Sequence, residues 1–210
     1  MVCPMSPQIT STKAPRVSRE VAVTRFLDAV ISLMDTKPIP DISIQEIADT
    51  VGLNHGYVFR YFGTRLDLFS SVTDELADRA LAAVTTEMTR RRESGETSNP
   101  GDLSLIALGR PFTMKRMSVI QYLTTCGVPP ARFGPKSRDM IETSVQTLLA
   151  QGMSLKMAKA QAFKISIMLW AQQALSESFG VTSEEATELF FLTVDEITHT
   201  EESEKRLGWK

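Results

Sequence analysis

The side chains with the clearest capacity for ligand chemistry gather in residues 51–63, whose sequence is VGLNHGYVFRYFG. His55, Tyr57 and Tyr61 carry groups that hydrogen-bond to base edges and phosphates, and Arg65 follows with a permanent positive charge. Tyr61 and Phe62 are adjacent, so they cannot both face one core. One side of the segment is therefore expected to face outward, toward solvent or a groove.

The elements that position this segment are predicted to be helices. A first helix carries an apolar stripe at helical spacing and ends at residues 37–40, KPIP; the stripe is Val23, Phe26, Leu27, Val30 and Met34. A short second helix begins at a predicted capping box. In it the Ser43 hydroxyl accepts from the Glu46 amide, and the Glu46 side chain accepts from the Ser43 amide. Gly52 ends that helix and permits the left-handed turn that follows.

A third short helix is predicted after the turn. Asn54 is a suitable N-cap, and Val58 and Phe62, four residues apart, share the face expected to be buried. Thr64 and Asp67 form a further predicted cap, which opens a long helix. Two short helices joined by a tight turn are typical of helix-turn-helix DNA-binding domains, whose second helix enters the major groove.

The string IQEIADTVGLNHGYVFRYFGTRLDLF, residues 44–69, resembles the signature of the tetracycline-repressor (TetR) family of bacterial regulators. The positions in register with that signature are Ile47, Ala48, Gly52, Leu53, Gly56, Val58, Arg60, Tyr61, Phe62, Thr64, Arg65 and Leu68. The resemblance covers residues 18 to 76, and the rest of the chain agrees only in length and helix plan. It implies a dimeric, ligand-responsive regulator that binds a pseudo-palindromic double-stranded DNA operator.

Four positions depart from the family pattern. Asn54 stands at the usual Ser and Arg65 at the usual Lys, so a cap and a charge are kept. Tyr57 stands at the usual Thr. Phe59 stands at the usual Tyr, a common phosphate ligand, so that contact is either lost or taken over by Tyr57 or Tyr61.

The predicted DNA contacts combine this resemblance with the outward-facing chemistry; they are Arg19, Ser43, Gln45, Asn54, His55, Gly56, Tyr57, Tyr61 and Arg65. His55 is explained equally well as a surface residue, and Gln45 as part of a solvated helix face. Phe59 is expected to be packed or half-exposed rather than a contact. The charge distribution fits local binding, because the net charge is −2 while residues 1–65 carry seven basic and six acidic side chains.

The remainder of the chain is also predicted to be helical. After a loop at 95–101, a helix begins near Leu103, breaks at 109–111 and is followed by another to Cys126; further helices are expected over 137–151, 154–179 and 182–197. No segment alternates as a strand would, so the fold class is all-α with about nine helices. The expected domains are a disordered basic arm at 1–16, the DNA-binding domain at 17–65, an effector-binding and dimerisation domain at 66–199, and a charged tail at 200–210.

The family resemblance implies a small-molecule effector pocket among the C-terminal helices and a homodimer formed by the last two long helices. Methionine and aromatic side chains are frequent there, and a plain hydrophobic core is the alternative explanation. The effector candidates are Met117, Gln121, Tyr122, Met168, Trp170 and Gln173.

Enzyme, metal and membrane functions find little support. His55 and His199 are the only histidines, and the chain has no metal-binding, P-loop or nucleophile motif, so no cofactor is expected. Cys3 and Cys126 are the only cysteines, and no apolar run is long enough to span a membrane, which favours a cytoplasmic protein. The rival hypotheses are an effector-independent or activating regulator, and an all-α adaptor or enzyme whose helix-turn-helix is only structural.

Overall fold

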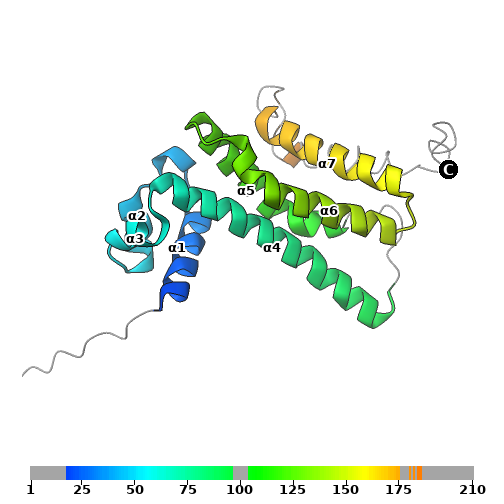
Figure 1. Ribbon diagram of the computed structural model, residues 1–210, viewed down its shortest axis with the longest axis horizontal. Coiled ribbons are helices and arrows are strands. Elements are labelled where there is room, and N and C mark those ends of the chain that lie inside the picture. The colour runs from blue at the N-terminus through cyan, green and yellow to red at the C-terminus, as the bar shows by residue number, and fades with distance from the viewer. Residues whose placement is uncertain (1–17, 97–103, 176–179, 181, 183, 186–210) are drawn as a thin grey trace, which may run out of the picture.

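The structure is a computed structural model that describes residues 18–96 and 104–175, together with residues 180, 182, 184 and 185, of the 210-residue chain. Within these residues the regular elements are all helical (Figure 1). They are α1 (Arg19–Leu33), η1 (Ile39–Asp41), α2 (Ile44–Val51), α3 (Gly56–Phe62), α4 (Arg65–Ser94), α5 (Ser104–Thr125), η2 (Pro130–Phe133), α6 (Gly134–Ala150) and α7 (Leu155–Leu175).

The all-α prediction is confirmed, with seven α-helices and two short 3-10 helices in the described ranges. The Thr182–Glu185 cap predicted for a final helix is present, since the Thr182 amide donates to Glu185 Oε2 at 2.9 Å and the Glu185 amide donates to Thr182 Oγ1 at 3.2 Å. The rest of the helix predicted over 182–197, the predicted arm at 1–16 and the predicted tail at 200–210 lie outside the described residues.

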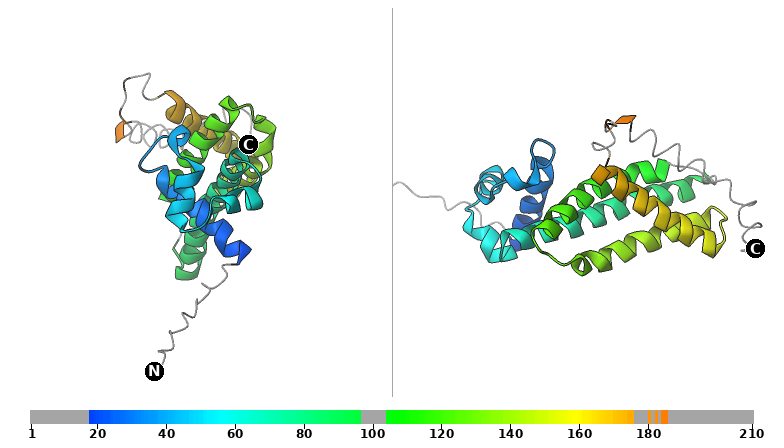
Figure 2. Two further views of the ribbon diagram at one scale, coloured as in Figure 1. Left: turned by 90° about the vertical axis from the view of Figure 1, so that its left-hand side faces the viewer. Right: turned by 90° about the horizontal axis from the view of Figure 1, so that it is seen from above.

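The helices form two groups along one long axis. Helices α1, α2 and α3 cluster around the N-terminal end of α4 (Figure 1). Helix α5 packs along α4, and α6 and α7 complete a bundle beyond the small group (Figures 1 and 2). Helix α4 therefore runs from the small helices into the bundle.

Two helix starts carry the predicted caps, although with different partners. The Thr64 side chain accepts from the Asp67 amide at 3.1 Å, and Asp67 accepts from the Thr64 amide at 3.0 Å, so this capping box is complete. At α2 only half of the predicted box forms. Ser43 accepts from the Glu46 amide at 3.1 Å, but the Glu46 carboxylate pairs with Lys37 at 2.5 Å instead of accepting from the Ser43 amide. A full charge is the stronger partner for that carboxylate.

The predicted helix break at 109–111 is wrong, because α5 is continuous from Ser104 to Thr125 with Pro111 inside it. Gly109 is buried where α5 crosses α4, and an added Cβ there would lie 3.3 Å from Val84 Cγ2 and 3.4 Å from the Ala80 carbonyl oxygen. The glycine thus serves close packing of two helices. Pro111 is exposed, so water can satisfy the carbonyl group that its ring leaves unpaired.

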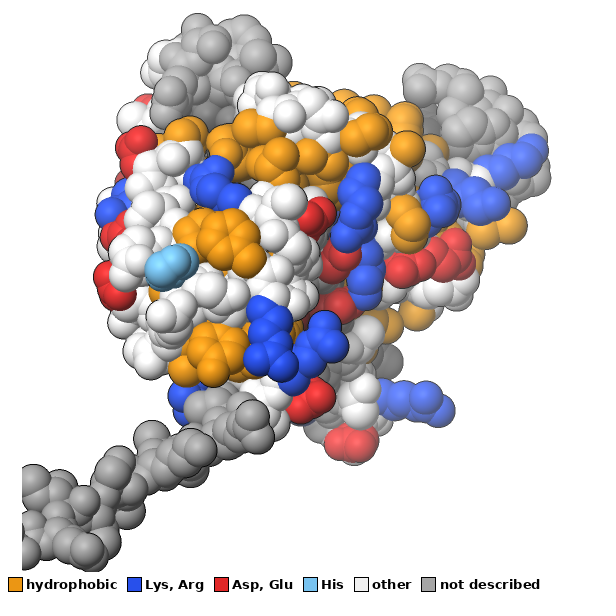
Figure 3. Space-filling view, turned by 60° about the vertical axis from the view of Figure 1, so that its left-hand side comes forward, with side chains coloured by type: hydrophobic (Ala, Val, Ile, Leu, Met, Phe, Trp, Pro, Cys, Tyr) orange, Lys and Arg blue, Asp and Glu red, His pale blue; other side chains and the backbone are white. Residues whose placement is uncertain are grey.

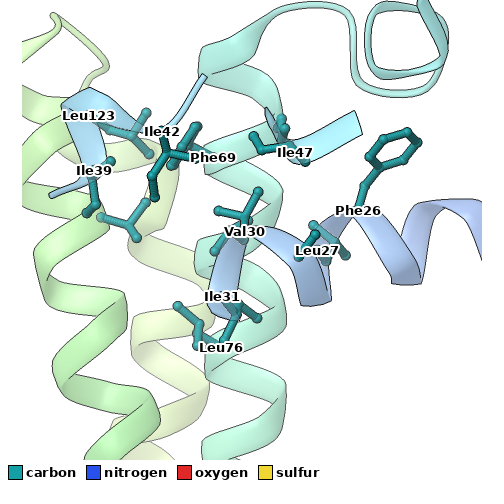
Figure 4. Packing of buried hydrophobic residues seen from close by; sticks show 14 of the residues in the cluster. Phe26, Leu27, Val30, Ile31, Ile39, Ile42, Ile47, Phe69, Leu76 and Leu123 are labelled. Carbon is teal, nitrogen blue, oxygen red and sulfur yellow. The ribbon is translucent and has the colours of Figure 1, made fainter. Parts of the chain in front are cut away.

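The largest hydrophobic core lies between α1–α3, the start of α4 and the end of α5 (Figure 4). Phe26, Ile47, Val58 and Phe69 are fully buried in it, and Leu123 of α5 joins them. The core therefore crosses the boundary expected between residues 65 and 66. The small helices are held against the bundle by shared apolar packing, not by a flexible linker.

Candidate functional site

The turn between α2 and α3 has the geometry of a helix-turn-helix. Gly52 lies in the left-handed region with φ 70°, and the Leu53 amide donates to the Ala48 carbonyl at 3.0 Å. No described atom lies within 4 Å of a Cβ built on Gly52, so backbone conformation, not space, favours glycine there. Leu53, at the corner of the motif, is half-buried against the largest hydrophobic core.

Helix α3 begins two residues after Asn54. The Asn54 Oδ1 atom accepts from the Gly56 amide at 2.8 Å, so the side chain does satisfy one free amide at this helix start. His55 occupies the N-cap position without a side-chain hydrogen bond to the helix and is exposed. The start of α3 thus presents His55 and Gly56 to solvent.

The two faces of α3 differ sharply. Val58 is fully buried, and Phe62 packs edge-on against Phe26 of α1 with ring centroids 6.2 Å apart. Tyr57 and Phe59, which lie on opposite flanks of that buried face, are 38% and 52% exposed. Figure 3 shows hydrophobic side chains exposed at this end of the molecule, with a histidine and basic side chains near them. The predicted buried face of Val58 and Phe62 and the predicted outward position of Tyr57 are confirmed, and Phe59 is half-exposed, one of the two positions expected for it.

Tyr61 has an intermediate position. It is half-buried against the main core, and its ring lies 5.5 Å from that of Tyr57. The Arg19 guanidinium lies over the Tyr61 ring at 5.9 Å from its centroid. Tyr61 therefore joins the start of α1 to the outward face of α3, and it positions both Arg19 and Tyr57.

The remaining polar candidates lie on α2 or before it. Ser43 is occupied by its capping bond to the Glu46 amide. Gln45 is exposed and donates to Asp49 Oδ1 at 2.8 Å. Phe59 and Arg60 were not among the predicted contacts, yet both are exposed on α3. Phe59 was not predicted as a contact because it lacks the hydroxyl of the usual Tyr.

Arg65 points into the protein rather than away from it. Its Nη2 atom donates to the Ile39 carbonyl at 2.9 Å and to the Ile42 carbonyl at 3.0 Å, and Nη1 donates to the Tyr122 hydroxyl. The guanidinium also stacks over Phe69, 4.6 Å from the ring centroid. Arg65 thereby ties the loop before α2 to the end of α5, which is a structural use of a residue predicted to bind phosphate.

A second candidate site is a cavity of about 500 Å³ inside the bundle, between α4, α5, α6 and α7. Most of its lining is apolar, including Leu81, Val84, Leu105, Met117, Ile120, Phe133, Met140, Ile141, Leu148, Met153, Ile165, Leu169 and Trp170. This size and character are typical of small-molecule sites. Among the described lining residues, Phe163, Ile167 and Trp170 are also exposed, so the cavity reaches the surface along α7.

The predicted effector residues do not all meet at this cavity. Met117 and Trp170 line it, while Met168 packs beside Met117 and Leu169 in a small adjoining cluster. Gln121 is exposed on α5, and Tyr122 belongs to the Arg65 contacts described above. The side chain of Gln173 lies outside the described residues.

Two cavity residues that the sequence reasoning missed are Arg110 and Arg116. Arg110 fell within the predicted helix break, so no face could be assigned to it. Burial lowers the pKa of both guanidinium groups, and for Arg116 the charge of Asp74 partly opposes that shift. Arginine remains charged despite such shifts, so the cavity wall carries positive charge.

The described residues contain no cluster of three or more potential metal ligands. None of the described helices has the length and hydrophobicity needed to cross a membrane.

Comparison with known proteins gives similarity of structure but not of sequence. No protein-family model matches the sequence, and no curated protein does either. A TetR transcriptional regulator from Rhodococcus sp. RHA1 is similar with a TM-score of 0.51 and 18% identity, over 87% of this chain and 96% of that one. A TetR variant from Acinetobacter baumannii AYE, solved in complex with minocycline, has a TM-score of 0.54 and 15% identity, over 88% of this chain and 96% of its own. The arrangement of helices described above is thus the fold of the TetR transcriptional regulators.

Proposed function

We propose that this protein is a ligand-responsive transcriptional regulator, a repressor that binds a pseudo-palindromic operator as a homodimer. The observation that carries the proposal is the two-sided α3. Its inner face is locked by Val58 and Phe62, while Tyr57 and Phe59 are exposed on a helix held at the end of the molecule. A short helix with this exposure, braced by α2 across a glycine turn, suits insertion into a major groove.

The chemistry of the exposed face fits DNA better than a protein core. Tyr57 and His55 offer hydrogen bonds to bases or phosphates, and the Phe59 ring can contact a thymine methyl group or a sugar. Arg60 adds an exposed positive charge on the same helix. Arg65 is assigned a supporting role here, because its guanidinium already holds the loop before α2.

Dimerisation through α7 and the helix predicted over 182–197 is part of the proposal. On α7, Phe163, Ile167 and Trp170 recur at spacings of four and three residues and are 60%, 51% and 43% exposed. Such a stripe is expected to be covered by another helix. In a two-fold dimer the two α3 helices would read half-sites separated by about one helical turn of DNA, roughly 34–36 Å, or a multiple of it.

Effector control would act through α4. Its residues Ala80, Leu81 and Val84 line the cavity, while Leu68 and Phe69 of the same helix lie in the core beneath α1–α3. A ligand that binds the cavity better in one orientation of α4 would shift the separation of the two α3 helices. Minocycline is bound by the structurally similar Acinetobacter protein, which supports a small molecule as the effector.

The DNA-binding assignment is tested by fluorescence anisotropy with DNA from upstream of the gene that encodes the chain. The double substitution Tyr57→Ala/Phe59→Ala should reduce specific affinity at least a hundredfold, because it removes two exposed contact side chains without touching the core. Leu108→Ala, which truncates a side chain that is 42% exposed on α5, is the matched control and should bind normally. Circular dichroism should be unchanged in both variants.

Specific binding that survives the double substitution would show that α3 is not the reading helix. A transcription assay from the same DNA then separates repression from activation. If the unmodified protein binds no DNA, an all-α adaptor or enzyme in which the helix-turn-helix is only structural would be favoured.

A further inference from the structure

The charge of the cavity wall is one-sided. The described residues that line it include two arginines, Arg110 and Arg116, and neither an aspartate nor a glutamate. Both arginines lie on α5, six residues apart, which corresponds to a rise of about 9 Å along the helix. The positive charge of the lining therefore comes from one helix, and most of the remaining lining is apolar.

Arg116 is the more deeply placed of the two, with 4% of its surface exposed. Its Nε atom donates to the Thr73 carbonyl at 3.1 Å, and its Nη2 atom donates to the Phe133 carbonyl at 3.3 Å and to the Ser137 hydroxyl at 3.2 Å. These acceptors are neutral, and Nη1 makes no hydrogen bond to a described residue. Buried cations in proteins are usually matched by an anion.

The nearby carboxylate does not provide that match. Asp74 favours the charged form of Arg116 at a distance, but its Oδ2 atom accepts from Arg132 at 3.2 Å. No carboxylate of the described residues forms an ion pair with Arg116. The protein thus holds the Arg116 guanidinium in a largely apolar lining with hydrogen bonds that fix its position, and no described carboxylate is paired with it.

We propose that the cavity binds an amphipathic anion, with its hydrophobic body against the apolar lining and its carboxylate or phosphate group on the Arg110–Arg116 wall. The inference rests on the effector role assigned to this cavity under the proposed function. Planar guanidinium groups bind carboxylate and phosphate oxygens in paired hydrogen bonds, and the low-polarity surroundings strengthen that attraction. The same wall disfavours cationic ligands, because their charge would face two arginines.

Hydroxyl side chains also line the cavity, one of them on α5 with the arginines. Thr113 lies between the two arginines in sequence on α5, and Ser137 and Ser144 line the cavity from α6. Each of these three hydroxyls already donates to a backbone carbonyl group, Thr113 to Gly109 at 3.1 Å, Ser137 to Phe133 at 2.8 Å and Ser144 to Met140 at 3.0 Å, so it would donate to an anionic oxygen only in place of that bond. The remaining lining from α4 and α7 is apolar enough to receive a hydrocarbon or aromatic body.

The test compares charged and neutral ligands of the same shape. Calorimetric titration of the full chain would use straight-chain carboxylates from hexanoate to tetradecanoate, each beside the primary amide of equal length. Alkyl phosphates form a separate arm, which distinguishes the two kinds of head group. At the best chain length the anion should bind at least tenfold more tightly than its amide.

Matched substitutions locate the effect. Arg110→Gln should reduce the anion-to-amide ratio severalfold while leaving amide affinity unchanged. Arg116→Lys retains a charge but not the guanidinium geometry, and should also reduce the ratio. Arg138→Gln changes an exposed arginine of α6 that is not part of the lining, and should leave the ratio as it is. A thermal melt of each variant separates lost binding from lost folding.

The outcomes discriminate between this inference and the proposed function. Equal affinity for anions and amides, or no binding of either series, would overturn the inference. A ratio that stays high in both Arg110→Gln and Arg116→Lys would also overturn it, because the charge preference would then lie elsewhere. If the anions bind as expected but leave the protein on its DNA, the ligand class stands and the regulatory assignment of the cavity fails.

Discussion

The two ends of this molecule are built in opposite ways. Around α1–α3, the aromatic and aliphatic residues Phe26, Val58 and Phe69 are fully buried, and helix starts are capped by Ser43 and Thr64. Between α4 and α7, the packing leaves a cavity of about 500 Å³ and apolar side chains that remain exposed. A dense core holds α3 in one geometry, whereas a loosely filled bundle can adapt to a ligand.

The arginines of the two ends make the same distinction. Arg65 donates to two carbonyl groups and the Tyr122 hydroxyl and stacks over Phe69, so the protein itself uses the guanidinium. Arg116 is likewise held by two carbonyl groups and a hydroxyl, but unlike Arg65 it lines the cavity. The first arginine acts as a structural tie, and the second offers charge to a ligand.

The largest expected effect comes from removing a large side chain at the densely packed end. Phe69→Ala should lower the free energy of unfolding by about 3–5 kcal/mol, because a buried ring is replaced by a cavity. Met140→Ala, which enlarges an existing cavity from a half-buried position, should cost about 1 kcal/mol or less. Urea unfolding monitored by circular dichroism measures both values. Equal losses would remove the contrast between the two ends.

Arg65 gives the next largest effect. Arg65→Ala should lower the free energy of unfolding by about 2 kcal/mol, because carbonyl groups of Ile39 and Ile42 lose their donors. Arg65→Lys should recover less than half of this loss, since an ammonium cannot reproduce the paired and stacked contacts. Denaturant unfolding and DNA titrations at several salt concentrations should be run on both variants.

The lysine variant also decides between the two roles of Arg65. A structural tie predicts that DNA affinity falls with stability in both variants. A phosphate contact predicts that Arg65→Lys restores DNA affinity, and that Arg65→Ala is stable but loses about one unit of salt dependence. The second pattern would return Arg65 to the DNA contacts expected from the sequence.

A smaller effect is expected at the start of α4. Thr64→Ala removes half of the capping box and should cost about 1 kcal/mol of stability. Thr64→Ser keeps the hydroxyl and should cost only a few tenths of that. Thermal melts of the two variants provide the comparison. If Thr64→Ser loses as much stability as Thr64→Ala, the methyl group of Thr64 rather than its capping hydroxyl stabilises the helix start.

Local rules predicted the small helices well and the bundle less well. The turn at Gly52, the buried face of Val58 and the cap at Thr64 all depend on neighbours within four residues. The contacts of Arg65 with Tyr122 and of Arg116 with Thr73 join residues 57 and 43 positions apart, so no local pattern could indicate them.

The break expected at Gly109 and Pro111 failed for the same reason. Both residues are strong local signals for a turn, but the close approach of α4 at Gly109 supplies packing that outweighs the lost hydrogen bond. The error also hid Arg110, because a residue in a loop has no helix face. The cavity charge could be found only after α5 was known to be one helix.

The smallest predicted effect concerns the far end of α4, where a carboxylate lies between two arginines. Hydrogen bonds from Arg90 and Arg91 lower the pKa of Glu87 from 4.5 to about 2. Because the folded-state pKa is depressed, this interaction stabilises the fold fully above pH 4.5 and is lost as the pH falls toward 2.

Glu87→Gln should therefore lower the melting temperature slightly at pH 7, and the difference from the unmodified protein should shrink as the pH falls below 4.5. Glu93→Gln is the control, since Glu93 is exposed on the same helix and makes no ion pair with a described residue. A difference for Glu87→Gln that stays constant across this range would mean that the carboxylate is not ion-paired in solution. The contacts of Arg65 lie in the core between the small helices and the bundle, whereas the side chains of Glu87, Arg90 and Arg91 are solvated. Salt therefore screens the attraction between them. The small difference in melting temperature at low ionic strength should vanish near 1 M salt.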